Sequence, residues 1–133
     1  MSLGKRFATA MAEKDAETLR DLLTHDVDFK GLTPGRFWEA GTPEEVAAIL
    51  FGTWFAPDDH IERLVAAEDG EDVADVHRVG YRFEVTTPDG PHTVEQQAYY
   101  RQADGRLSYV RVVCSGFRPS TGDPTTRGPV EVS

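Results

Sequence analysis

Three turn signals in the second half of the chain constrain its fold more than any other feature. They are Asp69-Gly70, Pro88-Asp89-Gly90-Pro91 and Asp104-Gly105, and they separate segments rich in β-branched and aromatic residues. We expect strands near residues 60–68, 72–87, 92–103 and 106–117. Because short loops join consecutive strands, the three longer strands should form an antiparallel meander.

The first half of the chain has helical periodicity instead. Phe7 and Met11, with alanines between them, predict a short first helix, and Asp15 can cap a second helix with a leucine stripe. Residues 27–32 predict a short strand. Thr42 begins a third helix, with a proline at the first helical position and a glutamate that completes a capping box. Helices followed by a meander predict an α+β domain.

Composition limits the classes of partner. The chain has 133 residues, of which 39% are hydrophobic and 28% charged, so one domain with a single core is expected. The formal net charge of −9 disfavours nucleic acid, because such binding depends on Lys and Arg contacts to phosphates. It also disfavours anionic membrane surfaces, and no apolar run approaches the ~20 residues that a membrane span needs. We therefore expect no nucleic acid and no membrane as partners.

The ends of the chain and its cysteine add three expectations. Residues 1–6 are polar, without the hydrophobic region of a signal peptide, so a cytoplasmic location is expected. Residues 119–133 are rich in Pro, Gly, Ser and Thr, which predicts a disordered tail after a domain over residues 1–118. Cys114 is the only cysteine, so the chain can form neither an internal disulfide nor a cysteine-based zinc site.

Alternation along the strands predicts which side chains share a face. If residues 88–91 form the turn between the second and third predicted strands, Tyr81 lies near Gln97 and Phe83 near Glu95. This face is the more apolar one, so helices should cover it, and its polar groups favour a polar network or an enclosed ligand pocket. The opposite face mixes Arg, Gln, Tyr and Val, which is typical of a half-exposed surface or a subunit interface. The covered face is predicted to carry Val73, Asp75, His77, Val79, Tyr81, Phe83, Val85, Glu95, Gln97, Tyr99, Arg101, Ser108, Val110, Val112 and Cys114.

Five polar residues on the predicted covered face are catalytic candidates. Glu95 is either a base in an apolar cavity or the partner of a nearby cation. Gln97 and Tyr81 either donate hydrogen bonds to a substrate carbonyl or satisfy each other. His77 is either a general acid/base or a histidine near a strand end that is partly exposed or hydrogen-bonded to Asp75.

Aromatic and small apolar side chains are expected to surround these candidates. Phe51 and Phe55 share helical spacing, which favours core packing for those two. Cys114 suits a buried packing position better than a nucleophile, which would need an activating base. The remaining histidines are unclustered and no glycine-rich phosphate loop is present, so we expect neither metal nor cofactor. The predicted pocket-lining residues are Phe29, Trp38, Trp54, Phe55, Phe83, Tyr99, Val112 and Cys114.

The order of elements resembles that of the nuclear transport factor 2-like superfamily. This group includes SnoaL-like polyketide cyclases, ketosteroid isomerases and limonene epoxide hydrolases. The resemblance covers residues 5–118 and depends on Asp15, on Asp26-Val27-Asp28-Phe29, on Asp104-Gly105-Arg106-Leu107 and on residues 31–39. It implies a cone-shaped domain in which a curved antiparallel sheet wraps around three N-terminal helices, a cystatin-like α+β barrel.

The resemblance also implies where family site residues would fall. Ketosteroid isomerases carry their catalytic carboxylate at about Phe29 and an oxyanion-binding acid near Gln97, and neither residue type is retained here. The Asp-Arg-Asp set of the limonene epoxide hydrolases is not evident. The His-Asp or carboxylate pair of SnoaL-like cyclases resembles His77 with Asp75 or Glu95.

Three hypotheses about function follow. The first is a cofactor-free cyclase, isomerase or lyase that acts on a small hydrophobic carbonyl compound. The second is a non-catalytic module that binds such a ligand or pairs with another protein. The third is a hydrolase of the epoxide-hydrolase type, with Asp75 or Glu95 activating water.

The resemblance further implies a homodimer through the outer sheet face. The side chains expected on that surface are Tyr100, Tyr109, Val94 and Val113.

Overall fold

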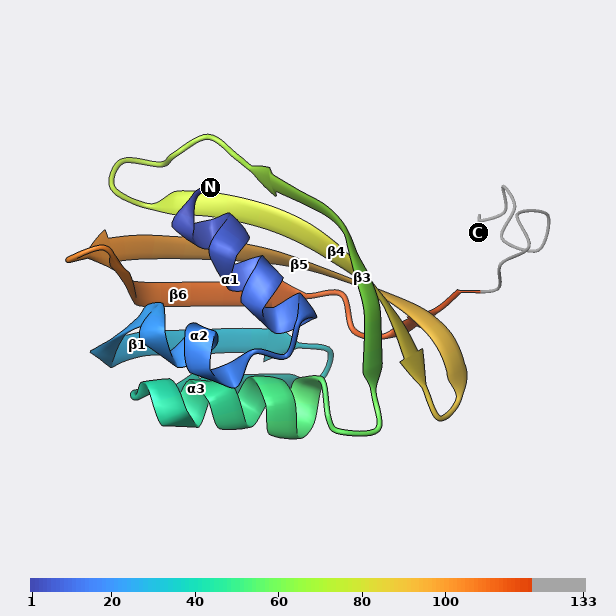
Figure 1. Cartoon of the computed structure of the whole chain (residues 1–133). Helices are drawn as coiled ribbons and strands as arrows, with labels where there is room; N and C mark the ends of the chain where they lie inside the picture. The colour runs from blue at the N-terminus through green and yellow to red at the C-terminus, as the bar shows by residue number, and fades with distance from the viewer. Residues whose placement is uncertain (121–133) are drawn as a thin grey trace.

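A computed structural model describes residues 1–120 of the chain (Figure 1). The predicted tail, 119–133, lies outside the described residues except for Pro119 and Ser120. The elements are α1 (Leu3–Ala12), α2 (Ala16–Asp21), β1 (Leu23–Thr33), β2 (Arg36–Ala40), α3 (Pro43–Ile49), the π-helical turn η1 (Leu50–Trp54), β3 (His60–Asp69), β4 (His77–Thr87), β5 (Gly90–Ala103), β6 (Arg106–Cys114) and β7 (Arg118–Pro119).

The strands form one curved sheet in the order β2-β1-β6-β5-β4-β3, with the short β7 paired to β5. All pairs are antiparallel except β1 with β6, which is parallel, so the sheet is mixed rather than wholly antiparallel. The sheet does not close, because β2 and β3 form its two edges. The helices lie on one side of it, with α1 over β3 and β4 and α3 beside β1 and β2 (Figure 1). The predicted α+β class and cone-shaped architecture are confirmed.

Both predicted helix caps are present. The Asp15 carboxylate accepts from Thr18 N at 3.1 Å, and the Thr42 hydroxyl accepts from Glu45 N at 3.2 Å. The Glu45 carboxylate reaches back to Gly41 N at 2.9 Å, one residue before the usual capping-box donor. These local contacts fix where α2 and α3 begin.

Two strand predictions are wrong in detail. Residues 36–40 form β2, because Gly35 adopts a φ of +77° and turns the chain back onto β1. The segment 72–76, predicted as the start of a long strand, instead forms a tight turn closed by a Val73–Val76 bridge. β4 therefore begins at His77.

The predicted register of β5 is also wrong by one residue. Thr87 pairs with Gly90, so the turn contains only two residues and Tyr81 lies opposite Gln96 rather than Gln97. A bulge beside Arg101 shifts the register between β5 and β6 by one residue. The residues of β6 that face the helices are therefore the predicted ones. Even-numbered residues of β5 thus face the helices, on the concave face, and odd-numbered ones occupy the outer face.

None of the helices within residues 1–120 is long and apolar enough to span a membrane.

Candidate functional site

Three side chains form a row across the middle of the concave face, here called the central row. Gln96 of β5 has Tyr81 of β4 as its register partner on one side and Cys114 of β6 on the other. Gln96 is 1% exposed and is the buried polar residue within an otherwise apolar core. The row therefore places an amide where the surrounding residues offer little hydrogen bonding.

The amide of Gln96 is only half satisfied. Its Oε1 accepts a hydrogen bond from the Tyr81 hydroxyl at 2.7 Å. Its Nε2 is buried and has no hydrogen-bond partner among the residues that the structure describes. Because buried polar groups are nearly always paired, this amide N–H group is a candidate contact for a ligand oxygen.

Tyr81 fixes the orientation of that amide. Burial raises the pKa of the Tyr81 phenol well above its usual value of 10, and the nearby Cys114 acts in the same direction. The phenol is therefore protonated at neutral pH and donates to Gln96. The amide nitrogen is left facing away from Tyr81.

Two consecutive aromatic residues cover this part of the sheet. Trp54 lies so close to Gly31 of β1 that a Cβ atom there would come within 2.6 Å of the indole Cη2. Phe55 packs edge-on against Phe83 of β4, with ring centroids 5.4 Å apart. Phe83 contacts Tyr81 with ring centroids 5.4 Å apart, and Gly31 is the register partner of Val112, so Phe55 and Trp54 lie beside the two ends of the central row.

The two aromatics lie at the end of the π-helical turn η1. Phe55 N donates to Leu50 O at 2.8 Å, across five residues instead of the four of an α-helix. The indole Nε1 of Trp54 is buried and has no partner within residues 1–120. The concave face thus holds two unpaired N–H donors, on Gln96 and Trp54.

Further aromatic contacts close this end of the sheet. Phe117 packs against Phe55 and His92, with centroids 5.7 and 6.1 Å apart. Trp38 meets Trp54 edge-on at 6.3 Å, and its own Nε1 donates to Thr33 Oγ1 at 2.9 Å. The donors of the concave face therefore lie in mainly apolar surroundings.

The structure brings together seven of the eight predicted lining residues. Phe29, Trp38, Trp54, Phe55, Phe83, Val112 and Cys114 lie on the helix-covered side. Tyr99 is the exception, because the shifted register of β5 turns it to the outer face, opposite Arg78 and Arg111.

Glu95 and Gln97 are likewise placed on the outer face, against the prediction. Glu95 Oε1 accepts from the Arg82 guanidinium, at 3.0 Å from Nε and 2.6 Å from Nη2. Gln97 lies over Gly80. Among the predicted catalytic candidates on β4 and β5, Tyr81 alone keeps its place in the centre of the covered face.

His77 and Asp75 are not partners. His77 lies at the end of β4, its Nδ1 3.0 Å from Asp72 Oδ1 and its ring beside Tyr100. Asp75 is exposed and pairs with Arg101 at 3.3 Å. Since Asp75 and Glu95 both occupy exposed ion pairs, neither faces the concave side as the hydrolase hypothesis requires.

Gln96 is the site residue that the sequence prediction missed. It follows Glu95 and precedes Gln97, so a shift of one residue exchanges it with either neighbour. Counting the turn as Pro88-Asp89 alone would have placed Gln96 on the covered face.

Two hollows lie elsewhere on the molecule. One of about 450 Å³ is on the outer face over β3, β4 and β5, and one of about 460 Å³ adjoins β1, β2 and the start of α3. No group of three His, Cys, Asp or Glu side chains that could hold a metal ion occurs in the described part of the chain.

Comparison with known proteins agrees with this architecture. A family model described as a SnoaL-like domain matches residues 5–110. No curated protein matches the chain.

Solved structures with the same fold carry several different names. A candidate isomerase from Bacillus subtilis has a TM-score of 0.68 at 12% identity, over 86% of this chain and 90% of that one. An LEH-like epoxide hydrolase from M. tuberculosis has a TM-score of 0.63 at 14% identity, over 85% and 80%. A candidate polyketide cyclase from Xanthomonas campestris has a TM-score of 0.60 at 15% identity, over 84% and 86%. At these identities the likeness concerns the fold alone.

Proposed function

Since the chain belongs to the SnoaL-like domain family, we propose that its concave face binds a small, mainly apolar carbonyl compound. The observation that carries this proposal is the buried Gln96 amide, whose oxygen is held by Tyr81 while its nitrogen has no partner within residues 1–120. A carbonyl oxygen is the complement of such a donor. The aromatic side chains on either side of the central row suit an apolar ligand body.

Energetics support a ligand at this position. A buried donor without a partner costs about 1–3 kcal/mol, so a core built for stability alone would favour an apolar residue here. A ligand oxygen at Gln96 Nε2 would remove that cost in the complex. The indole N–H of Trp54 offers a second donor on the same face.

Proton transfer would require a base beside the bound carbonyl compound. The register neighbours of Gln96 that can titrate are Tyr81 and Cys114. Tyr81 is unsuited to accept a proton at neutral pH, because burial raises its pKa. Among the register neighbours of Gln96, Cys114 is then the one left as a candidate base, and ligand binding without turnover is the function that this geometry supports best.

A matched pair of probes tests the binding proposal. Acetophenone and ethylbenzene are similar in size, but only the first has a carbonyl oxygen. We expect the chain to bind acetophenone ~5–10-fold more tightly, as one net hydrogen bond allows. Titration followed by the NMR signal of the Gln96 side-chain amide measures both affinities. In Gln96→Met the preference should disappear.

The same samples distinguish binding from turnover. Exchange of the acetophenone methyl protons with D₂O would reveal abstraction of a proton next to the carbonyl. We expect no exchange above the uncatalysed rate; exchange that Cys114→Ala abolishes would establish the enzymatic alternative. Equal affinities for the two probes in the unmodified chain would contradict the carbonyl site itself.

We also propose a homodimer through the outer sheet face. Three exposed apolar side chains adjoin one another there: Leu32, Phe37 and Val113 are 51%, 56% and 50% exposed, and Leu32 is the register partner of both others. Two residues first expected on this surface, Tyr100 and Val94, are instead buried on the concave face. The dimer would cover the apolar patch formed by β2, β1 and β6.

Replacing Phe37 by serine is expected to separate the dimer. Light scattering after gel filtration should give twice the 14.7-kDa chain mass for the unmodified protein and the single mass for the variant. Val73→Ser is the matched control, since Val73 is also exposed but lies in the turn before β4. A monomeric unmodified chain would refute the proposed interface.

A further inference from the structure

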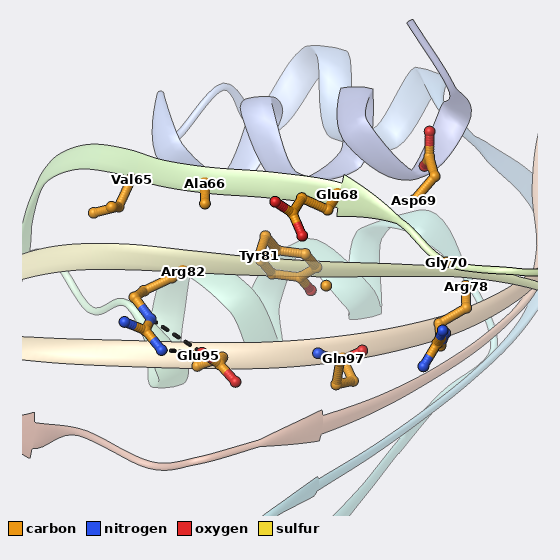
Figure 2. Close-up of a pocket in the computed structure, with 11 residues that line it drawn as sticks. Val65, Ala66, Glu68, Asp69, Gly70, Arg78, Tyr81, Arg82, Glu95 and Gln97 are labelled. Atoms are coloured by element: carbon orange, nitrogen blue, oxygen red, sulfur yellow. Dashed lines mark hydrogen bonds and ion pairs between the residues drawn. The ribbon is translucent and has the colours of Figure 1, made fainter.

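The hollow on the outer face shares Tyr81 with the central row, but its other lining residues lie outside that row. It lies over β3, β4 and β5 and has a volume of about 450 Å³, which is within the range of small-molecule sites. Figure 2 shows Arg78, Arg82, Glu95 and Gln97 along β4 and β5, with Glu68 on β3. The proposed carbonyl site uses none of these side chains.

Two glycines give room to polar side chains that line the hollow. Gly80 pairs with Glu68 on one side and with Gln97 on the other, and the Gln97 amide lies over it. A Cβ atom at Gly80 would come within 2.5 Å of Gln97 Nε2, and one at Gly70 would overlap the Arg78 guanidinium. Larger residues at either position would displace the polar side chains that line the hollow.

The two arginines of the hollow differ in their charge balance. Arg82 is neutralised by Glu95 through two hydrogen bonds. Arg78 forms no side-chain hydrogen bond and no ion pair with any residue from 1 to 120, although its guanidinium packs on Gly70. The hollow therefore contains one arginine fork that is free to bind an anionic group.

An acidic group in the same hollow is also unpaired. Glu68 has no ion-pair or hydrogen-bond partner for its side chain among the described residues, whereas the neighbouring Asp69 accepts from Ser2 Oγ at 2.7 Å. The Gln97 amide, across Gly80 from Glu68, likewise has no hydrogen-bond partner in the described part of the chain. One free cation thus adjoins one free carboxylate and one free amide.

We propose that this hollow binds a small amino carboxylate, with Arg78 holding the carboxylate and Glu68 and Gln97 Oε1 holding the ammonium group. A plain anion would meet the unpaired Glu68 and a chain of net charge −9, which oppose its binding. A ligand that carries both a carboxylate and an ammonium group complements Arg78 with the first and Glu68 with the second.

The strand geometry suits a ligand of amino-acid size. Arg78 and Gly80 are two residues apart on β4, a separation of about 7 Å. Glu68 and Gln97 each lie one strand away from Gly80, at about 4.8 Å between strands. The carboxylate would thus lie toward Arg78, and the ammonium group between Glu68 and Gln97 Oε1.

Titration of the isotope-labelled full chain with each protein amino acid in turn tests this proposal. We expect saturable shifts of the Gly70 and Gly80 amide signals for at least one amino acid. Arg78→Gln should weaken that binding by ~10-fold or more, because a charge-assisted pair is lost. Arg63→Gln is the matched control: Arg63 lies on the same face but pairs with Glu84 outside the hollow, and its loss should leave the affinity unchanged.

N-acetylation of the ligand tests the two charged groups separately, because it removes the positive charge of the amino group and leaves the carboxylate. The N-acetyl derivative should bind more weakly to the unmodified chain, and Glu68→Gln should remove the difference between the two ligands. The proposal is overturned if no amino acid gives saturable shifts, if Arg63→Gln weakens binding as much as Arg78→Gln, or if the acetylated form binds equally well. Circular dichroism of each variant checks that the fold is retained.

Discussion

Substituting Gly31 by alanine is expected to lower the free energy of unfolding by about 1–3 kcal/mol, the usual range for overpacking a core. The added Cβ would lie 2.6 Å from Cη2 and 2.7 Å from Cζ2 of Trp54. The indole has little room to retreat, because Phe29 and Trp38 pack against it with ring centroids 5.9 and 6.3 Å away. Urea denaturation of the purified chain measures the loss.

A double-mutant cycle identifies Trp54 as the cause. Trp54→Ala alone should cost about 3–5 kcal/mol, but adding Gly31→Ala to it should cost little more, since the clash is gone. Gly52→Ala is the control, because a Cβ there meets nothing within 4 Å. Strictly additive losses in the cycle would show that Gly31 is not required by the indole.

Replacing both Tyr81 and Gln96 should abolish the preference for a carbonyl ligand without lowering the stability of the chain. Tyr81→Phe alone leaves Gln96 Oε1 without its donor, and Gln96→Met alone leaves the Tyr81 hydroxyl without its acceptor. Tyr81→Phe should therefore destabilise the chain by about 1–3 kcal/mol, whereas Gln96→Met exchanges one unpaired group for another and should change the stability less. The double variant removes the donor, the acceptor and the unpaired Nε2 together, so it should be as stable as the unmodified chain or more so.

Thermal unfolding of the four chains measures this coupling, and acetophenone titration shows what is lost. We expect the double variant to be stable and to have no preference for the carbonyl compound. A double variant that is less stable than either single one would mean that the amide serves packing rather than a ligand.

Alkaline pH gives an independent readout for Tyr81. Its raised pKa means that the folded chain keeps the phenol proton above pH 10, whereas the unfolded chain loses it. The unfolded state then binds fewer protons, so stability falls as the pH rises above 10. This part of the alkaline loss should be absent from Tyr81→Phe.

Much of the fold follows from local sequence signals. Thr42 and Asp15 accept the expected backbone hydrogen bonds, and the paired turn residues fix where neighbouring strands reverse. Such signals act within a few residues, so they identify elements and their order. They do not determine the register in which each strand pairs with the next.

The prediction of the site depended on that register. Four turn-forming residues, Pro88 to Pro91, are compatible with either a four-residue or a two-residue connection, and the choice exchanges Gln96 with its neighbours. The bulge beside Arg101 has no local signature either. The pocket-lining aromatics were predicted better, because residues such as Phe29 and Phe83 lie on strands whose inward-facing residues do not change with the register of β5.

The parallel pairing of β1 with β6 determines the order in which the molecule can be assembled. It joins Phe29 to Val110, and it is the only link in the described sheet between β2–β1 and β5–β4–β3. Contacts this distant along the chain slow folding, since a long loop must close before they form. On the ribosome, the early helices and the first two strands must wait for almost the entire chain to emerge. Until then β1 presents an unpaired edge, and the hydrophobic layer beneath it stays incomplete.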